Sequence, residues 1–174
     1  MGAKAMNVHV KGLRHVGDGL DIQAFRAITR SMVNSVAVVT ASHRERIAGA
    51  IAGAFQPVCA APATVLIGLD RAHCAHGLVA SSRRFVVNVL ADDQIELGNR
   101  FGGIGDDRFG DVDYTLSLEG TPILDGVLAV LECETVDQLT VACQTIFVGR
   151  VLRGSRSRSF PLVSHNDSYM AAGR

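Results

Sequence analysis

The sequence predicts a mainly β protein, a β-barrel or sandwich with a few helices. Hydrophobic residues make up 48% of the 174 residues and charged residues 20%, which is typical of a folded domain with its own core. About six or more short, β-branched runs are separated by turn residues, whereas only two or three short stretches have a helical period. This spacing is typical of a closed all-β sandwich or barrel.

The first predicted element is a helix that begins after residue 20. Asp21 is of a residue type that commonly caps helices. Apolar residues then recur at i, i+3 and i+7 on one helical face, at Phe25, Ile28 and Met32. Arg26 and Arg30 lie on the other side of this helix.

The strands follow as short apolar runs. Buried strands are predicted at "SVAVVTA" (35–41), "TVLIGL" (64–69) and "RFVVNVL" (84–90). The polar run "HRER" (43–46) predicts a hairpin turn after the first of these strands. The stretch "AGAIAGAFQPVCAAP" (48–62) then predicts the next strand and its exit.

The second half of the chain predicts a further antiparallel pair of strands, at "VLAVLECETV" (127–136) and "QTIFVGRVL" (144–152). Short helices are predicted over 72–82 and over 92–101, and Asp92 is expected to cap the second. The Gly- and Asp-rich stretch 102–113 predicts a loop that acts as a lid or lies at the edge of a ligand site.

The chain is predicted to hold one domain, residues 21–174, preceded by an N-terminal arm, residues 1–20. The 17 Lys and Arg residues balance the 17 Asp and Glu residues, which argues against a nucleic-acid or anionic-membrane partner. No apolar run reaches the length of a membrane span, and no secretory signal pattern is visible at the start. A cytoplasmic location is therefore expected.

Several reactive side chains are given a structural interpretation. The scattered cysteines are expected to be reduced, and Cys143 to be an inert buried thiol: Cys59, Cys74, Cys133 and Cys143. His73 and His76 share a helical face without a nearby carboxylate, so no metal site is predicted. Asp106, Asp107 and Arg108 are expected to form a local ion pair in a solvated loop.

The stretch 48–62 is unusual because it carries no charge, and no polar side chain before Gln56. Its residues before Phe55 are alanine, glycine and one isoleucine. Two explanations remain open at this point. The small residues serve tight packing, or they let the backbone come close to a ligand that larger side chains would exclude.

Six segments, in order, carry a family resemblance: "FRAITRSMVNSVAVVTA", "AGAIAGAFQPVCAAPATVLIGL", "DRAHCAHGLVASSRRFVVNVLADDQIELGNRFG", "DRFGDVDY", "GTPILDGVLAVLECE" and "TIFVGRVL". This ordered set resembles the flavin reductase-like family, the small reductase partners of two-component flavin monooxygenases. The similarity spans Phe25 to Tyr169. Its most specific parts are "RFVVNVLADDQIELGNRF" and "GTPILDGVLAVLEC".

The resemblance implies an FMN-binding split barrel of the Greek-key type that forms a homodimer. It implies FMN or FAD as the flavin and NAD(P)H as the electron donor. The protein would be an NAD(P)H:flavin oxidoreductase whose reduced flavin passes to a partner flavin-dependent monooxygenase. Because the cofactors carry the hydride chemistry, no residue is assigned a catalytic role.

The resemblance also implies cofactor-binding residues, with main-chain N–H groups donating to phosphate or ring oxygens. The implied flavin-binding residues are Ala50, Ile51, Ala52, Ala54, Phe55, Asp70, Arg71, Ala72, Val87, Asn88, Phe101 and Phe109. Phe55 fits core packing and packing at the ring edge equally well. Arg71 is expected to pair with a phosphate or ribityl oxygen. Gln144 and Tyr169 are implied on the nicotinamide side.

Two departures from the family pattern support an alternative function. The family's Ser and Thr hydroxyls are replaced at Ile51, Ala54, Pro57 and Cys59. Its Gly-Asp-His motif is replaced by residues 142–144, and Gln144 can form hydrogen bonds but cannot titrate. The alternative is a non-catalytic or divergent binding module of the same barrel. A third possibility is a flavin enzyme whose ring is reduced by something other than NAD(P)H.

Overall fold

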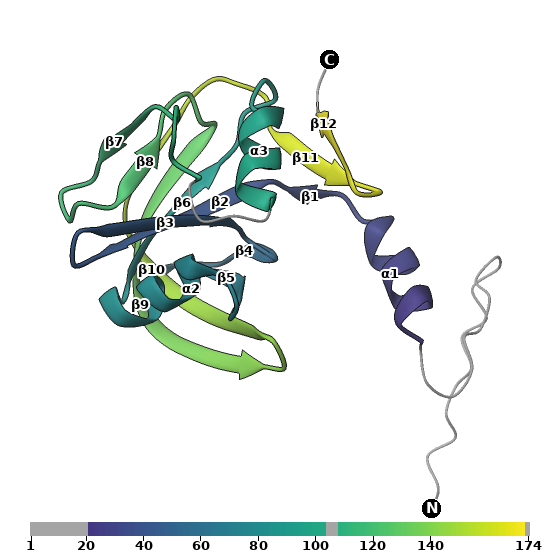
Figure 1. Ribbon diagram of the computed structural model, residues 1–174, viewed down its shortest axis with the longest axis horizontal. Helices are drawn as coiled ribbons and strands as arrows, with labels where there is room; N and C mark the ends of the chain where they lie inside the picture. The colour runs from purple at the N-terminus through teal and green to yellow at the C-terminus, as the bar shows by residue number, and fades with distance from the viewer. Residues whose placement is uncertain (1–20, 104–107, 173–174) are drawn as a thin grey trace, which may run out of the picture.

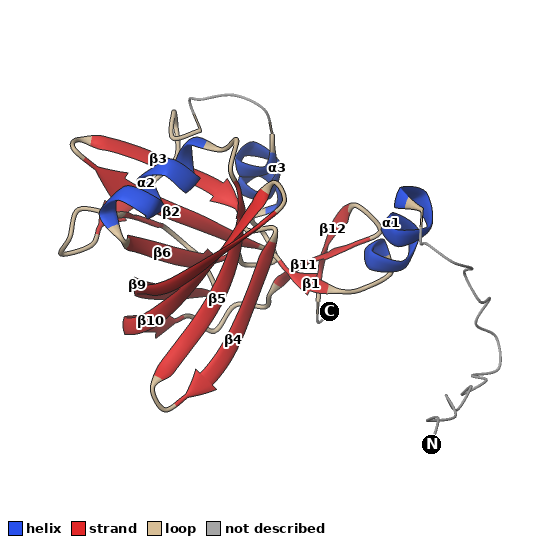
Figure 2. Ribbon diagram, turned by 90° about the horizontal axis from the view of Figure 1, so that it is seen from below, coloured by secondary structure: helices blue, strands red, loops and turns tan. Residues whose placement is uncertain are grey.

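The computed structural model describes residues 21–103 and 108–172, and its centre is one curved antiparallel sheet (Figures 1 and 2). The strand order in this seven-stranded sheet of the described residues is β3-β2-β6-β9-β10-β5-β4. The bounds are β2 (Ala37–His43), β3 (Arg46–Ile51), β4 (Ala54–Ala60), β5 (Ala63–Asp70), β6 (Arg84–Val89), β9 (Ala129–Val141) and β10 (Gln144–Arg156). The predicted antiparallel pair is confirmed as β9 and β10. The predicted arm, 1–20, lies outside the described residues.

The sheet curves into a barrel that stays open between its two edge strands. These edges, β3 and β4, follow each other in the chain with only Ala52 and Gly53 between them. The Ala52 amide donates to the Ala37 carbonyl at 2.9 Å, and the Gly53 amide donates to the Gly68 carbonyl at 2.8 Å. The expectation of a closed barrel was therefore wrong. The stretch 48–62 also holds two strands rather than one, because the chain passes from one sheet edge to the other within it.

Side chains on the two faces of the sheet enter two different cores. Successive side chains of β6 point to opposite faces. We call the buried cluster that contains Val87 the inner core and the cluster that contains Val86 the outer core. Inside the barrel mouth, α2 (Cys74–Ser82) adds three buried side chains to the inner core, Ala75, Leu78 and Val79. The outer core lies under α3 (Ile95–Gly102), β8 (Pro122–Leu124) and β11 (Leu162–His165).

The first predicted central helix is confirmed but begins two residues later than expected. A turn precedes α2, in which the Asp70 carboxylate accepts the Ala72 amide at 2.9 Å. The Asp70 carbonyl also accepts the His73 amide at 3.1 Å. An Asp side chain that bonds the backbone two residues ahead is a common way to build a turn. Cys74 is consequently the first residue of the helix.

The second predicted central helix begins at Ile95, and its N-cap residue is Gln94. The prediction that Asp92 caps this helix was wrong, because the intervening residues form a turn. The Gln94 side chain accepts the Ala91 amide at 3.0 Å and donates to the Asp125 carbonyl at 2.8 Å. Gln94 therefore joins the start of α3 to the loop that follows β8.

Asn88 is the polar centre of the outer core. Its side chain is fully buried on β6. Its Nδ2 donates to the Val38 carbonyl at 3.2 Å and to Thr40 Oγ1 at 3.1 Å, while its Oδ1 accepts the Leu124 amide at 2.9 Å. Buried polar groups need such partners. Asn88 thus holds β8 against the outer face of the central strands.

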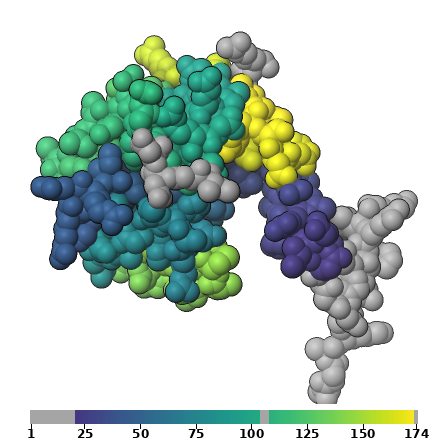
Figure 3. Space-filling model, in the orientation of Figure 1, coloured from purple at the N-terminus to yellow at the C-terminus, as the bar shows by residue number. Residues whose placement is uncertain are grey.

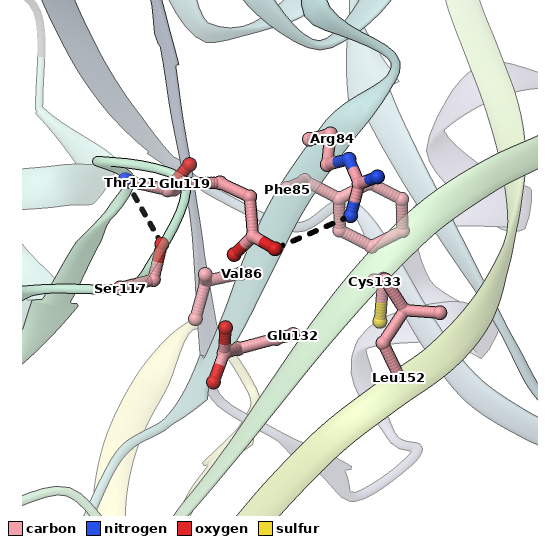
Figure 4. Close-up of a pocket in the computed structure, with 9 residues that line it drawn as sticks. All are labelled: Arg84, Phe85, Val86, Ser117, Glu119, Thr121, Glu132, Cys133 and Leu152. Carbon is pink, nitrogen blue, oxygen red and sulfur yellow. Dashed lines mark hydrogen bonds and ion pairs between the residues drawn. The ribbon is translucent and has the colours of Figure 1, made fainter.

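Ion pairs fix the hairpin of β7 (Tyr114–Leu116) and β8 to the same face. Glu119 in its turn lies 2.6 Å from Arg153 and 3.6 Å from Arg84. Glu132 lies 3.4 Å from Arg153. Figure 4 shows these glutamates and Arg84 around a cavity of about 10 Å³, which is room for about one water molecule. This cavity is therefore a detail of packing and too small for an organic ligand.

The N-terminal helix α1 (Ile22–Arg30) stands away from the barrel (Figures 2 and 3). Asp21 caps it as predicted, accepting the Ala24 amide at 2.8 Å. None of its residues is buried. Arg30 joins it to the hairpin of β11 and β12 (Ser168–Ala171), through an ion pair with Asp167 at 2.8 Å and a bond from the Asn166 amide at 2.9 Å. No helix among the described residues has the length and apolar character of a membrane span.

The cysteines differ in exposure. Cys133 is buried, and burial with a contribution from Glu132 raises its pKa to about 12. Cys59, Cys74 and Cys143 are exposed. The prediction that Cys143 is buried was wrong, because it lies in the tight turn between β9 and β10.

Gly49 on β3 is a position where the outer core leaves no room for a side chain. A Cβ there would lie 2.5 Å from Cε1 of Phe101, whose ring is fully buried. We expect Gly49→Ala to lower the free energy of unfolding by about 1–3 kcal/mol, because the ring must move. Denaturant unfolding measures this change.

The matched control is Gly77→Ala on α2. A Cβ at Gly77 meets nothing within 4 Å, and alanine favours a helix over glycine. This variant is expected to be at least as stable as the unaltered protein. Equal losses of stability in the two variants would contradict the packing described for Gly49.

Candidate functional site

Residues expected to bind a cofactor gather where the chain passes from β3 to β4. We call Ile51–Ala54 the crossover segment. Gly53 is exposed, and the other three residues of the segment are partly buried. The segment carries no polar side chain, and it lies at the opening of the barrel. A flat ligand can therefore approach its backbone closely.

Gln144, the first residue of β10, lies at one end of the crossover segment. A Cβ on Gly53 would lie 3.4 Å from Gln144 Oε1 and 3.6 Å from the Gly68 carbonyl oxygen. Gln144 Nε2 donates to Asp70 Oδ2 at 3.4 Å. The structure thus brings together three parts of the predicted site: the crossover segment, Gln144 and the turn at Asp70.

The backbone amides at this end are engaged within the protein. The amides of Ala52 and Gly53 bond to the neighbouring strands, as described above. The Arg71 amide donates to the Cys143 carbonyl at 2.9 Å, and the Ala72 amide donates to Asp70. Contrary to the expectation from sequence, these four N–H groups are not free donors for a phosphate. The strand ends and the turn need them, since an unpaired amide is costly.

The Arg71 side chain is exposed, and it forms no ion pair with any other described residue. Its charge acts on His76 in α2. Burial and, secondarily, Arg71 lower the pKa of His76, whereas Asp70 opposes this shift. His76 is held by a 2.9 Å bond between its Nε2 and Thr145 Oγ1. Arg71 is thus a cation available to a ligand at this end of the site.

Tyr169 and α3 lie at the other end of the crossover segment. A Cβ on Gly102 would lie 3.4 Å from Tyr169 Oη and 3.6 Å from Ile51 Cγ1. The Tyr169 ring packs directly on Gly98, where a Cβ would approach within 2.8 Å of Cε2. Burial raises the pKa of Tyr169, so its phenol stays neutral at physiological pH. The structure therefore joins Tyr169 to the crossover segment through Ile51.

Four residues implied in cofactor binding lie beneath this surface instead. Ala50 and Val87 are fully buried in the inner core, Phe101 is fully buried in the outer core, and Asn88 holds β8. In this structure they shape the barrel wall, and their contact with a cofactor stays a prediction. Phe109 packs edge-on against Phe101 at 5.3 Å between ring centroids.

Phe55 and Ala72 differ in their surroundings. Phe55 is partly buried and packs against the inner core, which bears out one of its two predicted roles. Ala72 is exposed in the turn before α2. Among the described residues, no three His, Cys, Asp or Glu side chains form a group that could hold a metal ion.

Arg108 is a structural residue that the sequence did not reveal. It was expected in a solvated loop, but only 8% of it is exposed. Its guanidinium donates to the carbonyls of Phe101 and Gly103, each at 2.6 Å, and of Gly49 at 3.4 Å. These bonds hold the end of α3 to β3 beside the crossover segment. Its predicted partners, Asp106 and Asp107, lie outside the described residues.

Comparison with known families decides how this site is interpreted. The family model described as "Flavin reductase like domain" matches residues 29–173, which is most of the chain. The chain belongs to the flavin reductase-like family. The split barrel predicted from the resemblance is thereby confirmed, with β3 and β4 as its open edges.

Two relatives are similar over most of their length. The reductase component of a 4-nitrophenol 4-monooxygenase/4-nitrocatechol 2-monooxygenase from Rhodococcus opacus is 33% identical over 143 residues, covering 82% of this chain and 77% of the relative. An FMN reductase (NADH) from Agrobacterium fabrum is 31% identical over 159 residues, covering 91% of this chain and 88% of the relative.

A solved structure supports the same family fold. The NADH:FAD oxidoreductase of Streptomyces globisporus C-1027, in complex with NAD and FAD fragments, superimposes on this flavin reductase-like chain with a TM-score of 0.85. It is 25% identical, and the match covers 92% of this chain and 98% of that one. The strand order and the position of the crossover segment thus belong to a fold that occurs in flavin reductases.

Proposed function

We propose that the protein is an NAD(P)H:flavin oxidoreductase that reduces FMN or FAD and supplies reduced flavin to a separate monooxygenase. The observation that carries this proposal is the family match over residues 29–173, which includes the crossover segment, Gln144 and Tyr169. Relatives at 31–33% identity are named as an FMN reductase and as a reductase component.

The crossover segment and its neighbours fit a flavin. The exposed Gly53 places bare backbone next to the Gln144 side chain, and no charged side chain interrupts the segment. The Gln144 carboxamide offers both a donor and an acceptor, as the polar edge of a flavin ring requires. Arg71 is an exposed cation next to them, and a phosphate is a suitable partner for it.

This arrangement indicates which roles belong to the flavin and which to the protein. A bound flavin supplies the acceptor for the nicotinamide hydride, so the protein needs no general acid or base for that transfer. We assign to the crossover segment the support of the flavin ring, to Gln144 the orientation of its polar edge, and to Arg71 the binding of a phosphate. Asp70 holds Gln144 in place through the bond between their side chains.

The alternative of a barrel without reductase activity is less well supported. It rests on the hydroxyls replaced at Ile51 and Ala54 and on Gln144. Hydride transfer between bound cofactors depends on geometry rather than on a titrating side chain. A relative 31% identical over 91% of this chain is named as an FMN reductase that uses NADH.

We also propose that the functional form is a homodimer in which a second copy covers α1. Phe25 and Ile28 on α1 are 56% and 52% exposed, and Met32, just beyond the end of the helix, is 59% exposed. A nine-residue helix is marginal in water on its own, and most helices depend on packing of an apolar face. Its own barrel does not cover this face, so another chain is the natural partner.

We place the protein in the cytoplasm and treat residues 21–174 as one domain. Free thiols are typical of a reducing compartment, and all four cysteines are free in the described residues. One continuous sheet runs through most of the described chain, which favours a single folding unit.

The function is tested by measuring the oxidation of NADH or NADPH, with and without added FMN or FAD. The loss of nicotinamide absorbance reports this oxidation. We expect steady oxidation that requires added or bound flavin. Flavin binding without oxidation of either nicotinamide would favour the third possibility, a flavin protein reduced by another donor. Absence of binding of both flavins at high concentration would reject the proposal.

Arg71→Met tests the assigned phosphate contact. A charge-assisted hydrogen bond contributes about 1.5–3 kcal/mol, so we expect the dissociation constant of FMN to rise by roughly ten- to a hundredfold. Riboflavin, which lacks the phosphate, serves as the control ligand and its affinity should not change. Titration of flavin fluorescence measures both. Equal weakening of FMN and riboflavin would show that Arg71 does not bind the phosphate.

Phe25→Asp tests the proposed dimer. The charge is expected to break a contact of the apolar face, so sedimentation should give the 18.4 kDa mass of one chain instead of twice that mass. Gln23→Asp, on the opposite side of α1, is the control and should remain dimeric. A monomeric unaltered protein, or a dimer that survives Phe25→Asp, would contradict this assignment.

A further inference from the structure

His76 in α2 contacts one face of the strand that begins with Gln144. Its Nε2 lies 2.9 Å from Oγ1 of Thr145, the second residue of β10. Its ring also packs on Phe147, with 5.5 Å between the ring centroids. Thr145 and Phe147 are two residues apart, so their side chains point to the same face of the strand. This face belongs to the inner core, and His76 covers its beginning.

Gln144 is held on the other face of β10 by the turn that precedes α2. Successive side chains of a strand alternate, so Gln144 projects to the face opposite Thr145. Asp70 is the partner of Gln144 in the pairing of β5 with β10. Asp70 Oδ2 accepts Gln144 Nε2 at 3.4 Å, while its Oδ1 accepts the Ala72 amide at 2.9 Å. The helix and its preceding turn therefore hold two successive residues of β10, one on each face.

The bond between His76 and Thr145 requires a neutral imidazole. The Thr145 side chain is only 3% exposed, so its hydroxyl hydrogen needs an acceptor within the protein. The unprotonated Nε2 of His76 is that acceptor, which places the ring proton on Nδ1. A protonated imidazole has donors on both nitrogens, and it would leave the buried hydroxyl hydrogen unpaired.

The surroundings of His76 favour this neutral form. Burial and, secondarily, the charge of Arg71 lower the pKa of His76, whereas Asp70 opposes this shift. Both charged residues lie in the turn before α2, and the two side chains that His76 contacts on β10 are uncharged. The imidazole is therefore neutral at pH 7, and it becomes protonated only as the pH falls below the ordinary histidine pKa of about 6.5.

We propose that His76 is a positioning residue of the flavin site, because its bond to Thr145 fixes the Gln144 carboxamide. This role rests on the proposed function, which assigns Gln144 to the polar edge of the flavin ring. A Cβ on Gly53 would lie 3.4 Å from Gln144 Oε1, so a small displacement of β10 changes the surface on which the ring lies. His76 acts through its neighbours and is assigned no contact with the flavin.

Riboflavin is the probe for this role, because it lacks the phosphate, which itself ionises at about pH 6. Thr145→Val removes the hydroxyl and nearly keeps the shape of the side chain. We expect this variant to raise the riboflavin dissociation constant about three- to tenfold at about pH 7.5, since one hydrogen bond is lost. Thr140→Val, at the exposed residue opposite Thr145 on β9, is the matched control and should leave the affinity unchanged. Flavin fluorescence measures both.

Gln144→Ala distinguishes positioning from a general structural role. If the bond acts through Gln144, Thr145→Val should weaken riboflavin binding in the unaltered protein but cause no further loss in Gln144→Ala. Equal losses in the two backgrounds, or an unchanged affinity in Thr145→Val, would overturn the proposal.

The pH profile of His76→Gln is an independent test. The Gln carboxamide can bond to Thr145 but cannot titrate. In the unaltered protein, riboflavin affinity should fall between about pH 7 and about pH 5, as the imidazole becomes protonated. His76→Gln should retain the affinity of the unaltered protein at about pH 7.5 and lose this dependence. A dependence that persists in His76→Gln would contradict the assignment to His76.

The titrations measure binding alone, so they separate this role from the proposed activity. A protein that binds riboflavin in this way but oxidises no nicotinamide would keep the role of His76 and lose the reductase assignment. A protein that reduces flavin, with riboflavin affinity unaffected by Thr145→Val, would keep the reductase assignment and lose the role of His76. A protein that binds no flavin would reject both.

Discussion

The passage of the chain from β3 to β4 is the constraint on which the fold and the site both depend. Two consecutive amides, those of Ala52 and Gly53, donate to opposite sides of the opening, one to β2 and one to β5. Hydrogen bonds to two strands at once hold the barrel at a fixed width where its edges do not pair. Ala52, Gly53 and Ala54 carry at most a methyl group, and this is also what leaves the backbone accessible there.

Two buried polar residues hold the elements on the outer-core side of this surface. Arg108 ties the end of α3 to β3, and Asn88 ties β8 to β2. Each is satisfied by carbonyl, hydroxyl or amide groups of separate strands or loops, so each acts as a cross-link within the outer core. These two residues fix the wall beside Ile51, whereas the turn that carries Arg71 is held by its own bonds to the Cys143 carbonyl and within Asp70–Ala72.

Much of the fold could be predicted from the sequence because strands and helices leave local patterns. The β-branched runs at 64–69 and 84–90 are buried strands, and Asp21 caps α1. The sequence did not predict the crossing from β3 to β4, because its only signal is a run of small residues. Tight packing explains such a run equally well. The prediction of a closed barrel was wrong for a different reason: whether two distant edge strands pair leaves no local pattern in the sequence.

The site was predicted less completely than the fold. A strand alternates between two faces, so neighbours such as Ala50 and Ile51 enter different cores, and a sequence motif cannot say which face a ligand meets. Arg108 could not be distinguished from a solvated cation, because burial of a loop residue depends on distant elements. Cys143 shows the opposite case: it was predicted to be buried, but it lies in an exposed turn.

The ion pair between Arg30 and Asp167 has a consequence for the two ends of the described chain. It is half exposed, and it links α1 to the hairpin that carries Tyr169. Any event that orders this hairpin also restrains the helix, and restraint of the helix orders the hairpin in return. By thermodynamic linkage, order in the helix and order in the hairpin should reinforce each other, and rising ionic strength should weaken this coupling.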